Sequence, residues 1–508
     1  MSLFRKKSLS GLLAQAAESE KGLKRTLGAG NLVALGIGAI IGAGLFVRTA
    51  AAAGGHAGSA VTISFVIAAV GCAFACLCYA EFASMIPIAG SAYTYAYATM
   101  GELIAWIIGW ALILEYALGA ATVSIAWSEF LNKLLDGRIP YEWSHSPFQK
   151  ALDVNGVMHH GIVNAPALII LLLLSLLLIK GTQESAIVNA IIVVIKVAIV
   201  LAFIVIGWNF INPSNHTPYM IPADAPPAIL PDGSTYSYLD TFRHGWGGVL
   251  RGAAIVFFAF IGFDAVSTAA QEAKNPKKDM PIGILGSLVV CTILYVLFSW
   301  VLTGVAPYSD FQKAGREASV AYAIDTYMPG YKWLSTMITV GILAGFSSVI
   351  LVMLLGQSRV FYSMAKDGLL PKVFSDLHPK FRTPYKSNAL LFFFVGTFAT
   401  LIPGDITGDL TSIGTLLAFV LVCIGIIIMR KTDPTTPRPF RTPMVPLVPI
   451  LGVIVCTAMI VSLDNTTLFS AFAWMILGLV IYFSYGRFRS KLVAPNEILP
   501  EKRDFDKQ

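Results

Sequence analysis

The stretch GIGAIIGAGLF, residues 36–46, lies inside the first long apolar segment of the chain and decides the fold. Four of its first nine residues are glycine, and each glycine inside a helix costs about 1 kcal/mol relative to alanine. We therefore expect the helix to break near Gly42. Broken backbone inside a bilayer persists only where protein buries it or where it lines a watery cavity.

The composition of the chain favours a membrane protein. Of its 508 residues, 56% are hydrophobic and 13% are charged, whereas soluble domains carry about 25% charged residues. Residues 1–30 are polar, so the first apolar run is expected to remain as a spanning segment and not to be cleaved as a signal peptide. The six cysteines all fall in apolar runs, which indicates packing residues and no disulfide framework.

Twelve apolar segments are long enough to cross about 30 Å of hydrocarbon. They lie at 31–53, 58–85, 103–131, 164–180, 185–210, 248–272, 282–306, 333–358, 387–403, 410–430, 446–463 and 467–486. We therefore expect an all-α polytopic membrane protein with one transmembrane domain at 31–486. Residues 1–30 and 487–508 form its two tails.

The orientation follows from the basic residues in the connections. With a cytoplasmic N-terminus, 26 of the 36 lysines and arginines fall on the inside. This asymmetry predicts a multi-pass plasma-membrane protein with both termini in the cytoplasm. The net charge of +7 then reflects topology and contact with anionic membrane lipid, and not nucleic-acid binding.

A second interrupted segment, FFAFIGFD at 257–264, places a glycine and a carboxylate in mid-membrane. The two interruptions fall in the first and sixth segments, which are the first helices of two five-helix halves. These matched positions predict a 5+5 inverted repeat with a binding site at the midplane. The halves are helices 1–5 at 31–210 and helices 6–10 at 248–430, followed by helices 11–12 at 446–486.

The chemistry of the two breaks suits an α-amino acid. A half-helix beginning at Gly42–Gly44 presents unpaired N–H groups and a positive dipole end to a carboxylate. Freed carbonyls near Phe258–Ile261 suit an ammonium group. The alternative is that the Gly38-x-x-x-Gly42 spacing is only a notch for helix packing.

Lys196 lies within the otherwise apolar stretch Ile191–Val200. A lysine at the bilayer centre costs about 2.5 to 3.5 kcal/mol on insertion scales, and such residues mark ion or substrate paths. Because burial disfavours the charged form of a lysine, Lys196 could load and release a proton. The alternative is a permanently charged pin between helices.

Several further motifs give the chain a family resemblance. They are GAIIGAGLF (38–46), YAEFAS (79–84), AGSAY (89–93), WALILEY (110–116), FIGFD (260–264), NP (275–276) before PIGI (281–284), and GQSR (356–359) before MAKDGLLP (364–371). Over roughly residues 25–430 the chain resembles the amino acid, polyamine and organocation (APC) superfamily. Its motifs are most similar to those of the bacterial cationic amino acid transporter branch.

The resemblance implies a leucine-transporter-like fold, alternating access and proton-driven uptake. By position, it implies these substrate-binding residues: Ile40, Ile41, Gly42, Ala43, Gly44, Phe258, Ala259, Phe260, Ile261 and, in the side-chain pocket, Tyr295. Lys196 would take the place of a sodium ion, with Ser347 or Ser348 nearby. Relatives often carry Ser or Thr at the position of Ala43, so a hydroxyl contact to the carboxylate is missing here.

Two carboxylates form a second tier of candidates. Glu115 would pair with Lys196, attract a cationic substrate, or stay protonated within a structural network, which is the role we expect. Asp264 is expected to tie down the unwound backbone. At the inner end of the eighth segment, Arg359, Lys366 and Asp367 are expected to make orientation and gating contacts.

We therefore expect a secondary active transporter of amino acids, with proton symport ahead of exchange and small neutral substrates ahead of cationic ones. A membrane amino acid sensor is the alternative from another class. Segments at membrane depth carry no catalytic set or metal-ligand cluster, so we expect neither an enzyme nor a metal or cofactor. A small single-helix membrane subunit is left open as a partner.

Overall fold

The computed structural model describes eleven stretches of the chain and is mostly helical. The described residues are 3–8, 27–86, 91–152, 157–180, 186–225, 228–229, 235–236, 242–268, 273–312, 319–381 and 383–491. Their helices are α2 (Ala29–Ile40), α3 (Thr49–Ala52), α4 (Val61–Met85), α5 (Ser91–Thr99), α6 (Glu102–Ile113), α7 (Gly119–Leu134), α8 (Tyr141–Ser144), α9 (Ala165–Lys180), α10 (Ala186–Gly207), α11 (Gly245–Val256), α12 (Phe263–Thr268), α13 (Pro276–Val305), α14 (Ser319–Tyr327), α15 (Lys332–Lys366), α16 (Tyr385–Leu401), α17 (Gly404–Thr432), α18 (Leu447–Ser462), α19 (Asn465–Ile481) and α20 (Arg487–Arg489).

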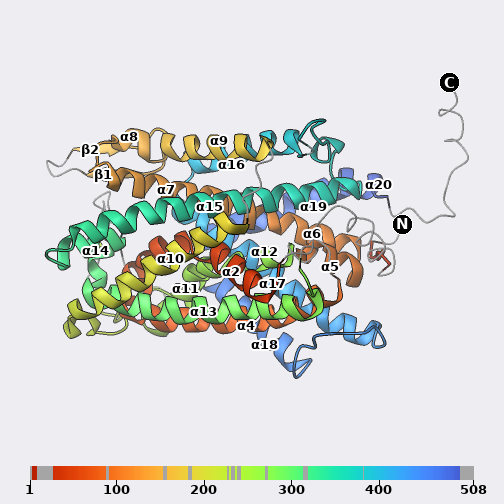
Figure 1. Cartoon of the computed structure of the whole chain (residues 1–508), viewed down its shortest axis with the longest axis horizontal. Coiled ribbons are helices and arrows are strands. Elements are labelled where there is room, and N and C mark those ends of the chain that lie inside the picture. The colour runs from red at the N-terminus through yellow and green to blue at the C-terminus, as the bar shows by residue number, and fades with distance from the viewer. Residues whose placement is uncertain are drawn as a thin grey trace, which may run out of the picture.

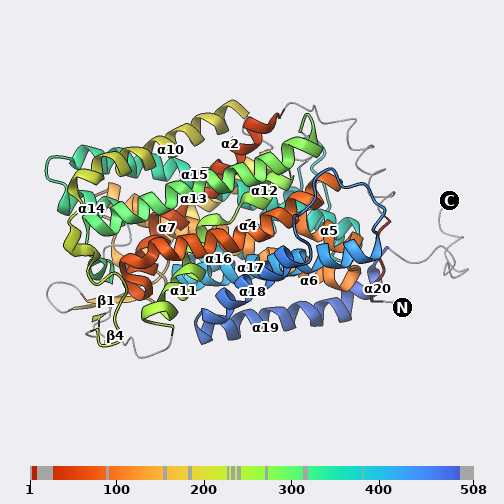
Figure 2. The same cartoon turned by 90° about the horizontal axis from the view of Figure 1, so that it is seen from below.

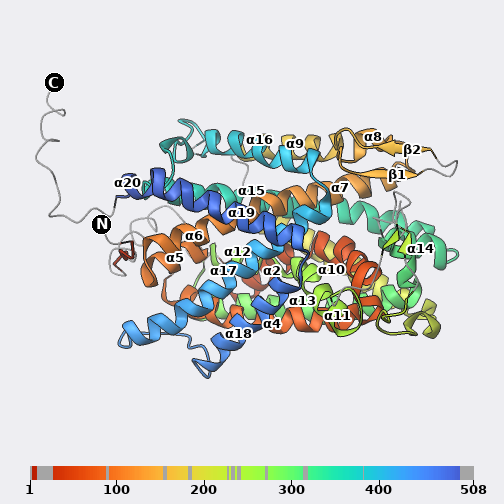
Figure 3. The same cartoon turned by 180° about the vertical axis from the view of Figure 1, so that it is seen from behind.

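The helices form one elongated bundle, in which α9 and α16 run side by side along one flank (Figures 1 and 3). Figure 2 shows α10 and α19 on opposite flanks. Two short antiparallel strand pairs lie in connections: β1 (Lys150–Leu152) with β2 (Met158–His160), and β3 (Ala228–Ile229) with β4 (Thr235–Tyr236). Residues 3–8 and α20 lie at one end of the bundle, which we call the terminal end. Helices α8 and α14 lie at the opposite end (Figure 1).

The prediction of a polytopic helical membrane protein is confirmed. Within the described stretches, seven helices are long and apolar enough to cross a membrane, and four shorter apolar helices accompany them. Each of the twelve apolar segments coincides largely with helix. The count of twelve crossings, the inverted repeat and the cytoplasmic placement of the termini stay predictions.

Both expected helix breaks are present. Helix α2 ends at Ile40, Ile41 is extended, and helical backbone resumes at Gly44–Arg48 as a π-helical turn. Helix α11 ends at Val256 and continues as the 3₁₀ turn Phe257–Phe260. Gly262 then has φ of 110°, which residues with a side chain rarely adopt. This backbone conformation explains why a glycine precedes α12.

The two breaks touch each other in the centre of the bundle. A Cβ atom on Gly44 would lie 2.2 Å from the Cα atom of Ala259. A Cβ atom on Gly42 would lie 3.3 Å from the Cγ2 atom of Val349 in α15. Glycine is therefore required at position 44 for the first break to approach the second.

Ion pairs close the end of the bundle opposite the termini. Arg48, one turn beyond the first break, is buried and donates to Asp409 of α17. Arg251 of α11 donates to Asp464 at 2.5 Å, just before α19. The first pair joins the half-helix after the first break to α17. The second pair joins α11, the half-helix before the second break, to the start of α19.

The connection between α17 and α18 is anchored by a buried carboxylate on α4. Glu81 accepts two hydrogen bonds from Arg430 at 2.9 and 2.8 Å and one from the Thr442 amide at 2.7 Å. Arg438 lies 3.2 Å from the same carboxylate. This connection is therefore fixed to the helix that carries the YAEFAS motif.

The Gly44 contact predicts a specific loss of stability. Gly44→Ala should destabilise the protein by about 1 to 3 kcal/mol, since the added methyl group meets backbone that cannot give way. The measurement is the thermal unfolding midpoint in detergent. Gly30→Ala in α2 is the control, because nothing lies within 4 Å of its added Cβ. Equal midpoints for the two variants would contradict the contact.

A histidine in the loop after α10 predicts a pH effect. His216 Nε2 lies 3.3 Å from the carbonyl oxygen of Trp300, and burial lowers the pKa of the imidazole below its usual value. The buried neutral imidazole therefore contributes to stability above about pH 6.5. This contribution is lost as the pH falls below that value, because protonation favours the unfolded chain. Unfolding midpoints should fall more steeply on acidification for the wild type than for His216→Gln, whereas parallel curves would refute this role.

Candidate functional site

The first break exposes backbone donors. The amides of Leu45 and Phe46 donate to the Gly42 carbonyl at 3.2 and 3.5 Å. Among the described residues, the amides of Gly42, Ala43 and Gly44 have no backbone acceptor. These donors begin the second half of the broken helix, where its dipole favours a negative charge.

The second break brings carbonyl groups to the same place. The Phe258 carbonyl accepts from the Ile261 amide at 3.3 Å, and the Ala259 carbonyl accepts from the Tyr295 hydroxyl at 2.9 Å. Each carbonyl oxygen has two lone pairs, so both can accept a second donor. Donors and acceptors therefore meet across the Gly44–Ala259 contact.

Tyr295 of α13 ties the two breaks together. Its hydroxyl lies 3.0 Å from the Ile40 carbonyl oxygen and 2.9 Å from that of Ala259. The side chain is fully buried, and its ring packs against Phe65 and Phe260 at centroid distances of 5.4 and 5.3 Å. The structure thus places the hydroxyl on both broken helices, in addition to placing the ring beside the breaks.

Lys196 of α10 holds the first half of the broken helix. Its ammonium group donates to the Gly38 carbonyl at 2.6 Å, and the side chain is 2% exposed. A narrow crevice beside it is lined by these residues: Ile41, Phe46, Ile199, Gly341, Ile342, Gly345 and Phe346. The lysine is the one charged group among the residues that line this crevice.

Glycines in α15 make room for Lys196. A Cβ on Gly345 would lie 2.8 Å from the lysine Cε, and one on Gly341 would lie 2.0 Å from the Ile199 Cδ1. Sequence reasoning missed this groove, although the Gly341-x-x-x-Gly345 spacing was a signal for it. Ser347 donates within α15 to the Leu343 carbonyl, and Ser348 is buried.

Glu115 and Asp264 form a buried pair of acidic groups. Glu115 lies in a π-helical turn, Leu114–Leu118, is fully buried, and interacts with Asp264 and Thr415. Asp264 is the carboxylate that interacts with it electrostatically. The pairing of Glu115 with Lys196 that the sequence allowed is therefore not formed, because the lysine reaches the Gly38 carbonyl instead.

Asp264 connects the second break to two other elements. It accepts hydrogen bonds from the Tyr116 hydroxyl and, at 3.4 Å, from the Ser91 hydroxyl at the start of α5. The carboxylate is 1% exposed. It lies one residue into α12, so its partners hold the chain where it leaves the break.

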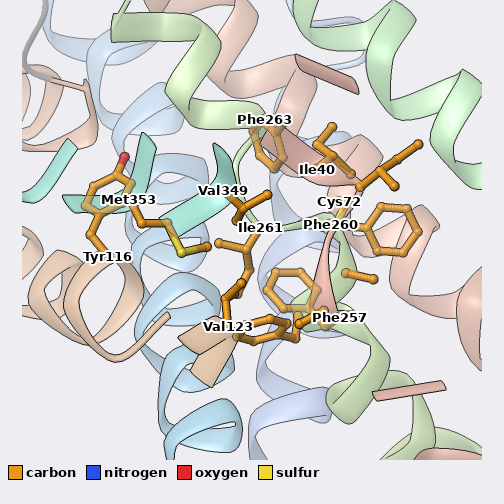
Figure 4. Packing of buried hydrophobic residues seen from close by; sticks show 14 of the residues in the cluster. Ile40, Cys72, Tyr116, Val123, Phe257, Phe260, Ile261, Phe263, Val349 and Met353 are labelled. Atoms are coloured by element: carbon orange, nitrogen blue, oxygen red, sulfur yellow. The ribbon is translucent and has the colours of Figure 1, made fainter. Parts of the chain in front are cut away.

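The walls around the breaks are apolar. Figure 4 shows Ile261, Val349, Val123 and Phe257 in one cluster of buried side chains. Phe46 contacts the rings of Phe298 and Phe346 at centroid distances of 5.7 and 6.2 Å. The arrangement presents polar backbone at the breaks and hydrocarbon around them.

Several other polar side chains make local contacts. Tyr93 and Tyr97 are buried, and their hydroxyls donate to Asp367 and Glu102. At the opposite end of the bundle, a hydrogen bond with His159 holds the pKa of Glu142 below its usual value. Within the described stretches, no group of three or more His, Cys, Asp or Glu side chains could hold a metal ion.

Comparisons with known proteins identify the family of the chain. A family model described as amino acid permease matches residues 27–483. The chain is 44% identical to the branched-chain amino acid permease BcaP of Bacillus subtilis, over 97% of this chain and 99% of that protein.

Other relatives carry different names. The methylthioribose transporter of B. subtilis is 40% identical over 97% of this chain and 99% of its own length. The vacuolar cationic amino acid transporter 4 of Arabidopsis thaliana is 34% identical over 85% of this chain and 68% of its own. The chain is therefore a multi-pass membrane transporter and not an enzyme, and it belongs to the amino acid permease family within the APC superfamily.

Proposed function

We propose that the protein takes up neutral amino acids with aliphatic side chains across the plasma membrane by proton-coupled alternating access, with both termini in the cytoplasm. The observation that carries this proposal is the junction at Gly44 and Ala259, where free amides meet carbonyls inside an apolar cluster. A zwitterionic backbone needs both kinds of group within a few ångströms of each other.

The substrate carboxylate accepts from the amides of Gly42, Ala43 and Gly44. The substrate ammonium donates to carbonyls of the 3₁₀ turn Phe257–Phe260 and of Ile261, which replace part of its hydration. Ala43 supplies no hydroxyl, so backbone amides and the helix dipole carry the carboxylate contact. Tyr295 keeps the two sets of groups in register through its contacts to both breaks.

The apolar walls favour an aliphatic side chain. Val349, which is next to Gly42, and the cluster member Ile261 offer hydrocarbon contacts worth about 0.8 kcal/mol for each buried CH₂ group. Because Glu115 lies beside Asp264, we assign it to the polar network and not to a site for a cationic side chain. The name of the B. subtilis branched-chain permease supports the same substrate class.

Lys196 couples the proton to the substrate site. When protonated, its ammonium holds the Gly38 carbonyl, two residues before the end of α2, and keeps the break in its binding shape. A charged hydrogen bond of this kind contributes about 1.5 to 3 kcal/mol. Deprotonation loosens that hold, so proton release accompanies substrate release. We assign Ser347 and Ser348 of α15 to proton coupling together with Lys196, and Glu115 and Asp264 to a supporting polar network.

Substrate class is tested by counterflow in proteoliposomes. Vesicles loaded with excess unlabelled leucine should accumulate labelled leucine, because both the apolar walls and the paired breaks suit it. Vesicles loaded with arginine or methylthioribose should not. Accumulation driven by arginine alone would contradict the neutral-substrate proposal. An absence of counterflow with every amino acid tried would favour a sensor.

Proton coupling is tested with Lys196→Met. The variant should retain leucine counterflow within about tenfold, because the breaks remain, but should lose accumulation driven by a pH gradient. The control is Lys180→Met, which changes an exposed lysine at the end of α9. Normal pH-driven accumulation in Lys196→Met would exclude the coupling role, and loss of counterflow together with accumulation would indicate a structural pin.

A further inference from the structure

Helix α18 carries a row of exposed apolar side chains along one face. Leu447, Ile450 and Ile454 follow one another at spacings of three and four residues, and all three are exposed. Residues at these spacings lie above one another on a helix. Because α18 is an apolar helix of a membrane transporter, this face meets the acyl chains of the lipid. We call it the α18 stripe.

The α18 stripe continues past the start of the helix. Met444 lies three residues before Leu447, and the Val448 amide donates to the Met444 carbonyl at 3.3 Å, as in a helical turn. The Met444 side chain is 68% exposed, and its backbone φ is 46°, in the left-handed region that residues with a side chain rarely adopt. Such a conformation persists only where the surrounding structure imposes it, and it is concentrated at functional positions. The fold therefore holds an apolar side chain outward at a conformational cost.

Contacts with α4 fix the connection that precedes Met444. The Phe440 amide donates to the Ser84 hydroxyl at 3.3 Å, and the Thr442 amide donates to the Glu81 carboxylate at 2.7 Å. Two alternate residues of the connection therefore bond to α4. The side chain of Arg441, which lies between them, is exposed.

Arg441 and Lys431 place two positive charges beside the α18 stripe. The Arg430 guanidinium donates to the Thr442 carbonyl at 3.1 Å, so the residues next to this pair, Lys431 and Arg441, lie in the same region. Both side chains are exposed, and within the described stretches neither forms an ion pair. Residues 430–446 have four basic side chains and one acidic side chain, so the connection keeps a net charge of +2 even beside the Glu81 carboxylate. This charge is available to an anion.

The length of α18 places these cations at the level of the lipid headgroups. Its 16 residues span about 24 Å, whereas the hydrocarbon core of a bilayer is about 30 Å thick. The turn at Met444 therefore lies at the edge of the hydrocarbon, and Arg441, three residues earlier, reaches the headgroup layer. Figures 1 and 3 show the blue connection before α18 projecting from the flank of the bundle, where lipid can reach it.

We propose that the α18 stripe and the connection before it form a binding site for an anionic phospholipid. The lipid phosphate accepts from the Arg441 guanidinium and the Lys431 ammonium, and one acyl chain lies along Met444, Leu447 and Ile450. A guanidinium donates two parallel N–H groups to a phosphate. A zwitterionic headgroup would bring its own cation against the two unpaired charges, so the site prefers a headgroup with a net negative charge, such as phosphatidylglycerol. The site holds for any substrate that the transporter takes.

Thermal unfolding of the full-length protein in detergent tests lipid binding. Added phosphatidylglycerol should raise the unfolding midpoint of the wild type more than phosphatidylcholine does, because a bound lipid stabilises the native state and not the unfolded chain. Arg441→Ala should need about fivefold more phosphatidylglycerol for the same rise, since one cation at the headgroup layer is lost. Lys332→Ala removes an exposed lysine at the opposite end of the bundle and should match the wild type.

Three results of the unfolding experiment would overturn the lipid site. The first is an equal response of Arg441→Ala and the wild type to phosphatidylglycerol. The second is an equal rise with the two lipids. The third is a rise with inorganic phosphate alone that equals the rise with phosphatidylglycerol, because it would indicate an anion site that needs no acyl chain.

Spin labels in lipid nanodiscs test the contact with acyl chains. The labels are attached to Met444→Cys and, as a control, to Thr435→Cys at an exposed polar residue of the same connection. The six native cysteines are buried, so the introduced thiol is the accessible one. The label at 444 should collide more often with oxygen, which concentrates in hydrocarbon, than with a water-soluble nickel complex, and the label at 435 should show the reverse. A label at 444 that collides mainly with the nickel complex would overturn the acyl-chain contact. Neither experiment measures transport, so both are independent of the substrate proposed above.

Discussion

The structure depends on one constraint, the contact between Gly44 and Ala259 where two broken helices meet inside the bundle. Each break leaves backbone groups without their helical partners, and a bilayer offers no water to replace those partners. The bundle meets the cost with long-range contacts: Tyr295 bonds to both breaks, and Lys196 bonds to the carbonyl of Gly38. The polar groups that remain are available to a zwitterion.

The same constraint is compatible with the alternating access that we propose. The half-helix after the first break is joined to α17 by Arg48 and Asp409, at the end opposite the termini. At the terminal end, Lys7 and Tyr93 meet on Asp367. Each broken helix consists of two halves joined by non-helical backbone. One half can therefore move while the other half stays in place beside the site. An ion pair at each end of the bundle is suited to such a movement, because it can break and re-form.

Sequence reasoning located what is local and missed what is long-range. The density of glycines predicted the break near Gly42, and the apolar residues around Lys196 marked that lysine as functional. Both signals are contained in a few consecutive residues. The acceptor of Lys196, the groove at Gly341 and Gly345, and the double contact of Tyr295 depend on helices far apart in the chain. For the same reason the Glu115–Asp264 neighbourhood and the choice of Lys7 as the partner of Asp367 had no signal in the local pattern.

The most direct measurement is an experimental structure of the protein with leucine bound. The account predicts the leucine carboxylate within hydrogen-bond distance of the amides of Gly42–Gly44 and its ammonium on carbonyls of Phe257–Ile261. The side chain should lie against Val349 and Ile261, and Lys196 should remain on the Gly38 carbonyl when the site is closed. Leucine bound away from both breaks, or a leucine carboxylate held directly by Lys196, would contradict the account.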